Sequence, residues 1–144
     1  MTGGSTGLFR VLDVNLNRAR EGLRVCEEVA RLILDDDGLT RKCQRLRYAV
    51  DRTAKLLSGG RLLQARDSSR DVGRPGRRGV VRPHGKILDL LTANLRRVQE
   101  ALRVLEEFSR LVEPAASRSF GSLRFRVYTL EQTFHSKSAA LRHR

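Results

Sequence analysis

The stretch "NLNRAREGLRVCEEVARL", residues 15–32, returns later in the chain as "NLRRVQEALRVLEEFSRL", residues 94–111. About eleven of the eighteen aligned positions are identical, at an offset of about 79 residues, which marks an internal repeat. In the first copy Leu16, Ala19, Leu23, Cys26 and Ala30 recur every three or four residues. This spacing puts apolar side chains on one face of an α-helix, so each copy predicts a long amphipathic helix.

The helices that follow the two copies resemble each other as well, with "LRYAV" at 46–50 and "LRFRV" at 123–127. The apolar spacing predicts long helices over 9–34, 39–57, 86–112 and 117–136, and a short one over 61–66. We therefore expect an all-α fold, a helical bundle built from a duplicated αα-hairpin with pseudo-twofold symmetry. Repeat 1 covers about 9–57, a long charged crossover loop about 66–85, and repeat 2 about 86–136. Residues 9–136 form the single domain, and 1–8 and 137–144 are expected to be flexible ends.

Chain length, net charge and cysteine content limit the kinds of protein and of binding partner that this sequence suits. A chain of 144 residues suits one domain, and its net charge of +13 favours polyanionic partners: nucleic acid, an anionic membrane surface or phosphate-bearing ligands. Cys26 and Cys43 form neither a disulfide framework nor a metal set, so both are interpreted as small buried hydrophobic residues. No apolar run approaches the length of a membrane span and no signal pattern opens the chain, so a cytoplasmic protein is expected.

One edge of each apolar stripe carries an unusual set of residues. An amide, a guanidinium and a small residue share that edge in both copies: Asn15, Arg18 and Gly22, then Asn94, Arg97 and Ala101. Such a set can form a notch for an anionic ligand, because the planar guanidinium binds two phosphate oxygens at once. The alternative is that each asparagine hydrogen-bonds to a neighbouring helix while each arginine reaches out to water.

Carboxylates supply the second group of candidates. Asp67 and Asp71 lie four residues apart in the charged loop, beside Arg66, and can share a magnesium ion with phosphate oxygens. The alternative is a flexible basic loop with a helix-capping aspartate. Glu21 and Glu100 lie between the apolar stripe and solvent, where either can act as a base or hold a metal.

Further charges are spaced four residues apart on the first helix of each repeat. They are expected to form solvated pairs: Glu27 with Arg31, Arg24 with Glu28, Glu106 with Arg110 and Arg103 with Glu107. In the crossover loop, Arg74, Arg77 and Arg78 lie among glycines in a setting that suits a polyphosphate.

The ordered set "LDVNLNRAREGLRVCEEVARLIL", "LRYAV", "ARDSSRDVG", "ANLRRVQEALRVLEEFSRL" and "LRFRVYTLEQ" resembles the small all-helical hydroxymethylpyrimidine phosphate kinase family. That family occurs alone or as the N-terminal domain of some bacterial thiamin-phosphate synthases. The resemblance implies ATP-dependent phosphorylation of hydroxymethylpyrimidine phosphate to the diphosphate, with Mg2+. It also implies a small phosphorylated pyrimidine, a nucleotide and a thiamin-phosphate synthase as partners.

The candidate site residues follow from both lines of reasoning. The expected phosphate-binding and substrate-binding residues are Asn15, Arg18, Arg24, Arg66, Asn94, Arg97 and Arg103. The expected catalytic carboxylates are Asp67, Asp71, Glu21 and Glu100, with Asp67 and Asp71 holding the metal. Two other functions stay open at this point, a basic helical nucleic-acid-binding module and a non-catalytic docking domain for the synthase. A homo-oligomer with the site between subunits also stays open.

Overall fold

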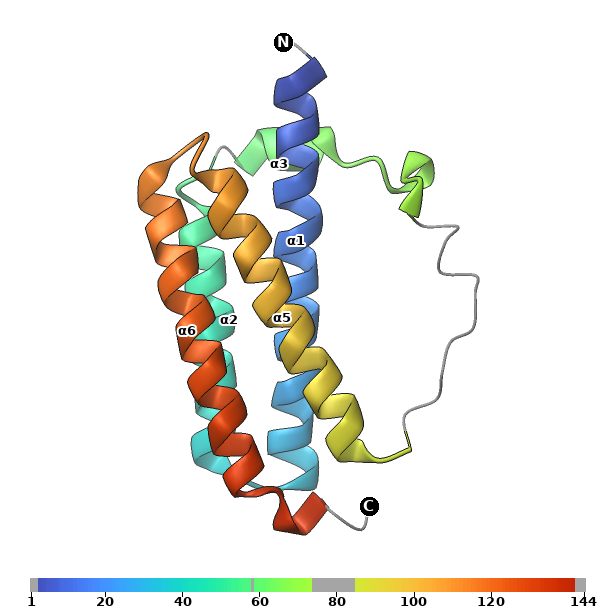
Figure 1. Ribbon diagram of the computed structural model, residues 1–144, viewed down its shortest axis with the longest axis vertical. Helices are drawn as coiled ribbons and strands as arrows, with labels where there is room; N and C mark the ends of the chain where they lie inside the picture. Colours follow the sequence, from blue (N-terminus) through green and yellow to red (C-terminus); the bar gives the residue numbers. More distant parts are fainter. Residues whose placement is uncertain (1–2, 58, 74–84, 142–144) are drawn as a thin grey trace.

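The computed structural model describes residues 3–57, 59–73 and 85–141, and within them every regular element is helical (Figure 1). The all-α prediction is therefore confirmed. In chain order the elements are α1 (Gly3–Glu28), the π-turn η1 (Val29–Ile33), α2 (Asp37–Ala54), α3 (Gly59–Ala65), the 3-10 turn η2 (Ser68–Arg70), α5 (Ile87–Ser109), α6 (Pro114–Ser136) and the 3-10 turn η3 (Ser138–Leu141). Arg74, Arg77 and Arg78 of the crossover loop lie outside the described residues.

The four long helices form a bundle in which each helix packs against two others. Helix α1 lies between α2 and α5, and α6 closes the ring by packing on the same two helices. The short helix α3 lies across α1, and η2 follows it on the side away from α6 (Figure 1). Helix α5 begins at the end of the bundle opposite to α3 (Figure 1).

The core is mostly aliphatic and contains three buried phenylalanines, Phe9, Phe120 and Phe134. Its largest fully buried side chains come from all four long helices and from the C-terminal turn: Leu12, Leu16, Leu23, Leu39, Val50, Leu91, Leu95, Leu102, Leu105, Phe120, Phe134 and Leu141. Nearly all of these positions fall on the predicted apolar stripes. Burying one such side chain contributes about 1.5–3 kcal/mol, so the stripes supply the main driving force for folding.

Several helix ends differ from the prediction. Helix α1 begins at Gly3 and Leu141 is buried in the core, so much of the expected flexible ends is ordered helix or turn. Pro114 starts α6 at its first turn, where the missing N–H of proline costs nothing, although the sequence pattern placed the start at 117. Asp36 caps α2, because its carboxylate accepts a hydrogen bond from the Leu39 amide at 2.9 Å.

The two hairpins share a contact that the sequence pattern did not predict. In the first, Nε and Nη2 of Arg47 donate to Oε1 of Glu27 at 3.2 and 3.0 Å. In the second, the same atoms of Arg124 donate to Oε1 of Glu106 at 3.3 and 3.0 Å. Each pair joins the two helices of its hairpin, so Glu27 and Glu106 pair across helices instead of with Arg31 and Arg110, the partners expected along the helix. Within their own helices they lie near Arg24 and Arg103, at 3.6 and 3.3 Å.

Candidate functional site

The amide-bearing edge of each repeat turns out to be a helix–helix contact. Asn15 and Asn94 are only 5% and 8% exposed. Their amide nitrogens donate to the carbonyls of Val11 and Leu90, both at 2.9 Å and both one turn earlier in the same helix, and not to a neighbouring helix as the alternative expected. A Cβ atom on Gly22 would lie 2.5 Å from Cγ2 of Val98 and 3.2 Å from the carbonyl oxygen of Asn94. Helix α5 therefore fills the space that Gly22 leaves, and the predicted ligand notch is closed by packing.

A separate hollow of about 310 Å3 lies between α1 and the segment 66–73 that follows α3; we call it the α1 pocket. It gathers five of the predicted site residues, Arg18, Glu21, Arg66, Asp67 and Asp71. Its remaining lining residues are Arg10, Asp13, Val14, Asn17, Ser68 and Gly73. The first helix of repeat 1 and the start of the crossover loop thus form one site, although some fifty residues separate them in sequence.

The pocket depends on an ion pair between Asp13 and Arg66. Asp13 is 4% exposed, and its carboxylate accepts two hydrogen bonds, from Nε of Arg66 at 2.8 Å and from Nη2 at 2.9 Å. The hydrogen bond and the charge of Asp13 raise the pKa of the Arg66 guanidinium. Arg10 adds a weaker bond from Nη2 to the main-chain oxygen of Asp67 at 3.4 Å. Arg66, predicted as a phosphate ligand, therefore fastens the loop to α1.

Sequence reasoning missed Asp13, although a signal was present. The residue lies between Leu12 and Leu16, on the buried side of the stripe, where a carboxylate needs a cationic partner. Asn17 was missed as well; it lines the α1 pocket, and its Oδ1 accepts a bond from Nη1 of Arg20 at 3.4 Å.

The loop carboxylates shape their own turn, and Oδ2 of Asp67 also lies 3.6 Å from Nε of Arg70. Oδ1 of Asp67 accepts bonds from Oγ of Ser69 at 3.1 Å and from the Arg70 amide at 3.2 Å, which caps η2. Oδ1 of Asp71 accepts a bond from the Gly73 amide at 2.9 Å. Oδ2 of Asp71 has no hydrogen-bond partner within the described part of the chain.

The donor set of the α1 pocket bears on the expected metal. The described residues contain no group of three or more His, Cys, Asp or Glu side chains that could hold a metal ion. Mg2+, however, usually takes one or two carboxylates and completes its shell with phosphate oxygens and water. Asp67 and Asp71 in one hollow fit an ion that arrives together with a phosphate, but not a metal held by protein alone.

The second repeat offers no equivalent pocket. Arg97 and Glu100 are exposed on α5. Glu100 and Arg103 line a different hollow, between α5 and α6, which shares no lining residue with the α1 pocket. The crossover segment that completes the α1 pocket packs on α1, so the structure does not bring the candidates of the two repeats together.

The remaining arginine candidates form surface ion pairs. Nε of Arg24 lies 3.2 Å from Glu28, and Nη2 of Arg103 lies 2.8 Å from Glu107, as the spacing of four residues predicted. Arg110, expected to pair with Glu106, pairs with Glu107 at 3.3 Å. Pairs of this kind contribute about 0.2–0.5 kcal/mol each and leave Arg24 and Arg103 outside the α1 pocket.

The two cysteines are buried among apolar side chains, as predicted. Burial raises the pKa of the Cys26 thiol far above its ordinary value and that of Cys43 to about 12. Both thiols therefore stay protonated at neutral pH. Neither can act as a nucleophile or a metal ligand in the folded protein.

Fold and site together define a class: a small all-helical domain made of two related hairpins, with a charged pocket on the first. The chain belongs to the ThiD2 family, whose model matches residues 10–133. None of the helices in the described residues is long and apolar enough to cross a membrane.

Curated relatives of this chain are named thiamine-phosphate synthases. The chain is 44% identical over 126 residues to the synthase of Synechocystis sp. strain PCC 6803, covering 88% of this chain and 36% of the relative. It is 42% identical over 137 residues to that of Thermosynechococcus vestitus, covering 94% and 38%. Identity to that of Rhodopirellula baltica is 31% over 137 residues, covering 95% and 36%. The chain thus spans little more than a third of these relatives, and no solved structure matches it.

Proposed function

We propose that this domain serves thiamin biosynthesis by phosphorylating hydroxymethylpyrimidine phosphate to the diphosphate with ATP, and that the α1 pocket is the active site. The family and the synthase relatives support the pathway. The observation that carries the site is the convergence of Arg18 and Glu21 on α1 with Asp67 and Asp71 from the crossover segment. No other part of the described chain gathers as many of the predicted residues in one hollow.

The chemistry needs little more than this pocket offers. The acceptor oxygen belongs to a phosphate and is already anionic, so positioning and charge neutralisation matter more than a strong base. Arg18 has an exposed guanidinium at the pocket, where its fork can hold two phosphate oxygens. Mg2+ arriving with ATP would be held by Asp67 and Asp71 and would neutralise charge on the transferred phosphoryl group.

The side chains that can recognise the pyrimidine are those with polar atoms available for hydrogen bonding. Asn15 and Asn94 donate their amide nitrogens to main-chain carbonyls and pack between helices. Asn17 is half-buried in the α1 pocket, and its amide nitrogen can donate to a ring nitrogen of the base. Glu21 lies exposed one turn further along, where its carboxylate can accept from the amino group of the pyrimidine.

The direct test is to incubate the protein with ATP, Mg2+ and hydroxymethylpyrimidine phosphate and to follow the diphosphate by 31P NMR or chromatography. The proposal expects the diphosphate with the unmodified chain and a loss of at least tenfold in rate for Asp71→Asn, whose fold is checked by circular dichroism. A chain that is folded and binds neither substrate would overturn the proposal.

A second candidate function is a docking domain for thiamine-phosphate synthase. The specific observation is that a stretch similar to this whole chain makes up a little more than a third of proteins named as that synthase. The test adds the chain to a separate synthase and measures the synthase rate with ready-made pyrimidine diphosphate. A higher rate or co-elution, without diphosphate formation by the chain alone, favours docking over catalysis.

A further inference from the structure

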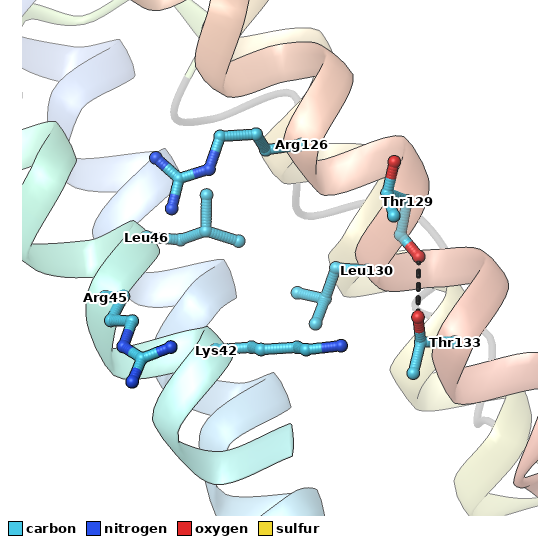
Figure 2. A pocket seen from close by; sticks show the side chains of 7 residues that line it. All are labelled: Lys42, Arg45, Leu46, Arg126, Thr129, Leu130 and Thr133. Carbon is cyan, nitrogen blue, oxygen red and sulfur yellow. Dashed lines mark hydrogen bonds between the residues drawn. The ribbon is translucent and has the colours of Figure 1, made fainter. Parts of the chain in front are cut away.

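The groove between α2 and α6 holds a second cluster of cations, on the side of the bundle away from η2 (Figure 1). A hollow of about 260 Å3 lies in this α2–α6 groove. Figure 2 shows Lys42 and Arg45 projecting from α2 and Arg126 reaching from α6 toward Leu46. The buried side chains of Leu46 and Leu130 form the apolar floor.

These cations have no counter-charge. No acidic residue lines the hollow, and Lys42, Arg45 and Arg126 form no ion pair with any residue that the structure describes. In contrast, the arginines that join helices elsewhere, such as Arg47 and Arg124, lie directly against carboxylates. All three side chains are exposed, so water screens their mutual repulsion, but an anion on the apolar floor would be attracted by three nearby positive charges at once.

The two hairpins contribute similar apolar residues to the groove but different charges. With the second helices aligned on "LRYAV" and "LRFRV", the hollow has a twin of about 340 Å3 further along the same groove. Leu46 in the first hollow corresponds to Leu123 in the twin. The three cations correspond to small uncharged residues, namely Ser119 for Lys42, Ser122 for Arg45 and Ala49 for Arg126. The twin contains Arg52 and shares Arg126 with the first hollow. Cations from both hairpins therefore meet in the first hollow, at positions whose counterparts in the other hairpin are uncharged.

The hydrogen-bond donors that remain free in the hollow are all cationic, so they favour an anionic ligand. Oγ1 of Thr133 donates to the carbonyl oxygen of Thr129 at 3.0 Å, and Oγ1 of Thr129 to that of Phe125 at 3.4 Å. The free donors are thus the ammonium of Lys42 and the guanidiniums of Arg45 and Arg126. We propose that the α2–α6 groove binds a small phosphate ester, whose phosphate contacts these three cations and whose apolar part rests on the leucines.

This site differs from the α1 pocket in one testable respect. The α1 pocket contains carboxylates and needs a divalent cation to hold a phosphate, whereas the α2–α6 groove is purely cationic. Binding in the groove is therefore independent of Mg2+. Phosphate binding in the α2–α6 groove is also independent of whether the α1 pocket is catalytic.

The experiment is a titration of the 15N-labelled full chain with phenyl phosphate and with inorganic phosphate, in EDTA, followed by amide NMR shifts. Saturable shifts are expected near 42–46 and 126–133, with phenyl phosphate binding several-fold more tightly because its ring covers the leucines. The triple variant Lys42→Gln, Arg45→Gln, Arg126→Gln is expected to weaken binding at least tenfold.

The matched control removes the same charge from exposed positions outside the groove: Arg31→Gln, Lys55→Gln and Arg118→Gln. It is expected to leave phenyl phosphate affinity within twofold, with both triple variants first checked for an unchanged melting profile. Equal weakening by the two variants would overturn the proposal, because it would show a general effect of net charge. Equal affinity for phenyl phosphate and inorganic phosphate would also overturn the proposal. A single-stranded oligonucleotide that binds the groove far more tightly than either phosphate would overturn it as well.

Discussion

At the scale of single residues, the ion pair between Asp13 and Arg66 decides where the crossover segment lies. Asp13 is buried, whereas the side chain of Arg66 is 45% exposed. Loss of one partner therefore has unequal effects, because an unpaired guanidinium can turn to water but an unpaired carboxylate stays buried.

We predict that Arg66→Ala destabilises the protein more than Asp13→Asn does. Asp13→Asn should lower the free energy of unfolding by about 1 kcal/mol, because Arg66 loses one charged hydrogen-bonding partner. Urea unfolding of both variants measures the difference. An equal or reversed order would mean that the pair does not hold the loop on α1.

Gly22 is the second residue whose role the structure defines. Alanine usually stabilises a helix interior relative to glycine, but here its Cβ would overlap Val98 and approach the backbone of α5. Gly22→Ala should therefore lower the free energy of unfolding by about 1–3 kcal/mol, as overpacking does. Gly7 is the matched control in the same helix, since a Cβ there meets nothing within 4 Å.

Gly7→Ala should raise stability, by about 0.5 kcal/mol. Thermal and urea melts of the two variants give the comparison. A neutral or stabilising Gly22→Ala would contradict the close packing of α1 on α5.

At the scale of helices, sequence periodicity predicted the helices and their buried faces, whereas the spacing of charged residues did not predict all of the ion pairs. The stripes through Leu16, Leu23, Leu95 and Leu102 predicted the helices and their buried faces, because burial follows a period of 3.6 residues. The π-turn η1 leaves no mark in that pattern. The partners of Glu27 and Glu106 were assigned within the helix, since one sequence shows neighbours along a helix and not across to the next.

Asp36 links the start of α2 to the end of α6. Its carboxylate accepts bonds from Nζ of Lys137 at 2.8 Å and from the Leu39 amide at 2.9 Å. These bonds, that of Lys137 first, lower the pKa of Asp36 below its ordinary value of 3.8. The stabilisation is therefore complete above the unfolded-state pKa and is lost as pH falls through the lower pKa of the folded state.

Asp36→Ala is predicted to cost about 1 kcal/mol at pH 7, the usual effect of removing a helix cap. The cost should shrink as pH falls through the lowered pKa of Asp36 in the folded state, because the carboxylate of the unmodified chain then becomes protonated as well. Urea midpoints measured in steps from pH 7 down into the acid range check this, and a cost that does not change with pH would exclude the charged cap.

At the scale of the whole molecule, the two hairpins differ at the candidate site. Both repeats carry an arginine and a glutamate at matching positions, but only α1 is covered by α3 and η2. The sequence identified Arg18, Glu21, Asp67 and Asp71 as candidates without showing that they meet. It could not choose between repeats, because the choice depends on the path of the crossover in space.

The charges of the α1 pocket predict its dependence on metal. Once Asp13 and Arg66 neutralise each other, two arginines, Arg10 and Arg18, face three carboxylates, Glu21, Asp67 and Asp71. A phosphate alone is therefore repelled. We predict that nucleotide binding, measured by calorimetry, weakens at least tenfold when EDTA replaces Mg2+; binding that is indifferent to Mg2+ would place the nucleotide elsewhere.

The claim that the site belongs to repeat 1 is tested most directly by twin substitutions in the pyrimidine phosphate kinase assay. Arg18→Gln and Arg97→Gln remove the same group from matching positions, and only Arg18 lies in the α1 pocket. The account predicts that Arg18→Gln lowers the rate of diphosphate formation at least tenfold while Arg97→Gln leaves it within twofold. Equal losses in the two variants, or a larger loss for Arg97→Gln, would contradict it.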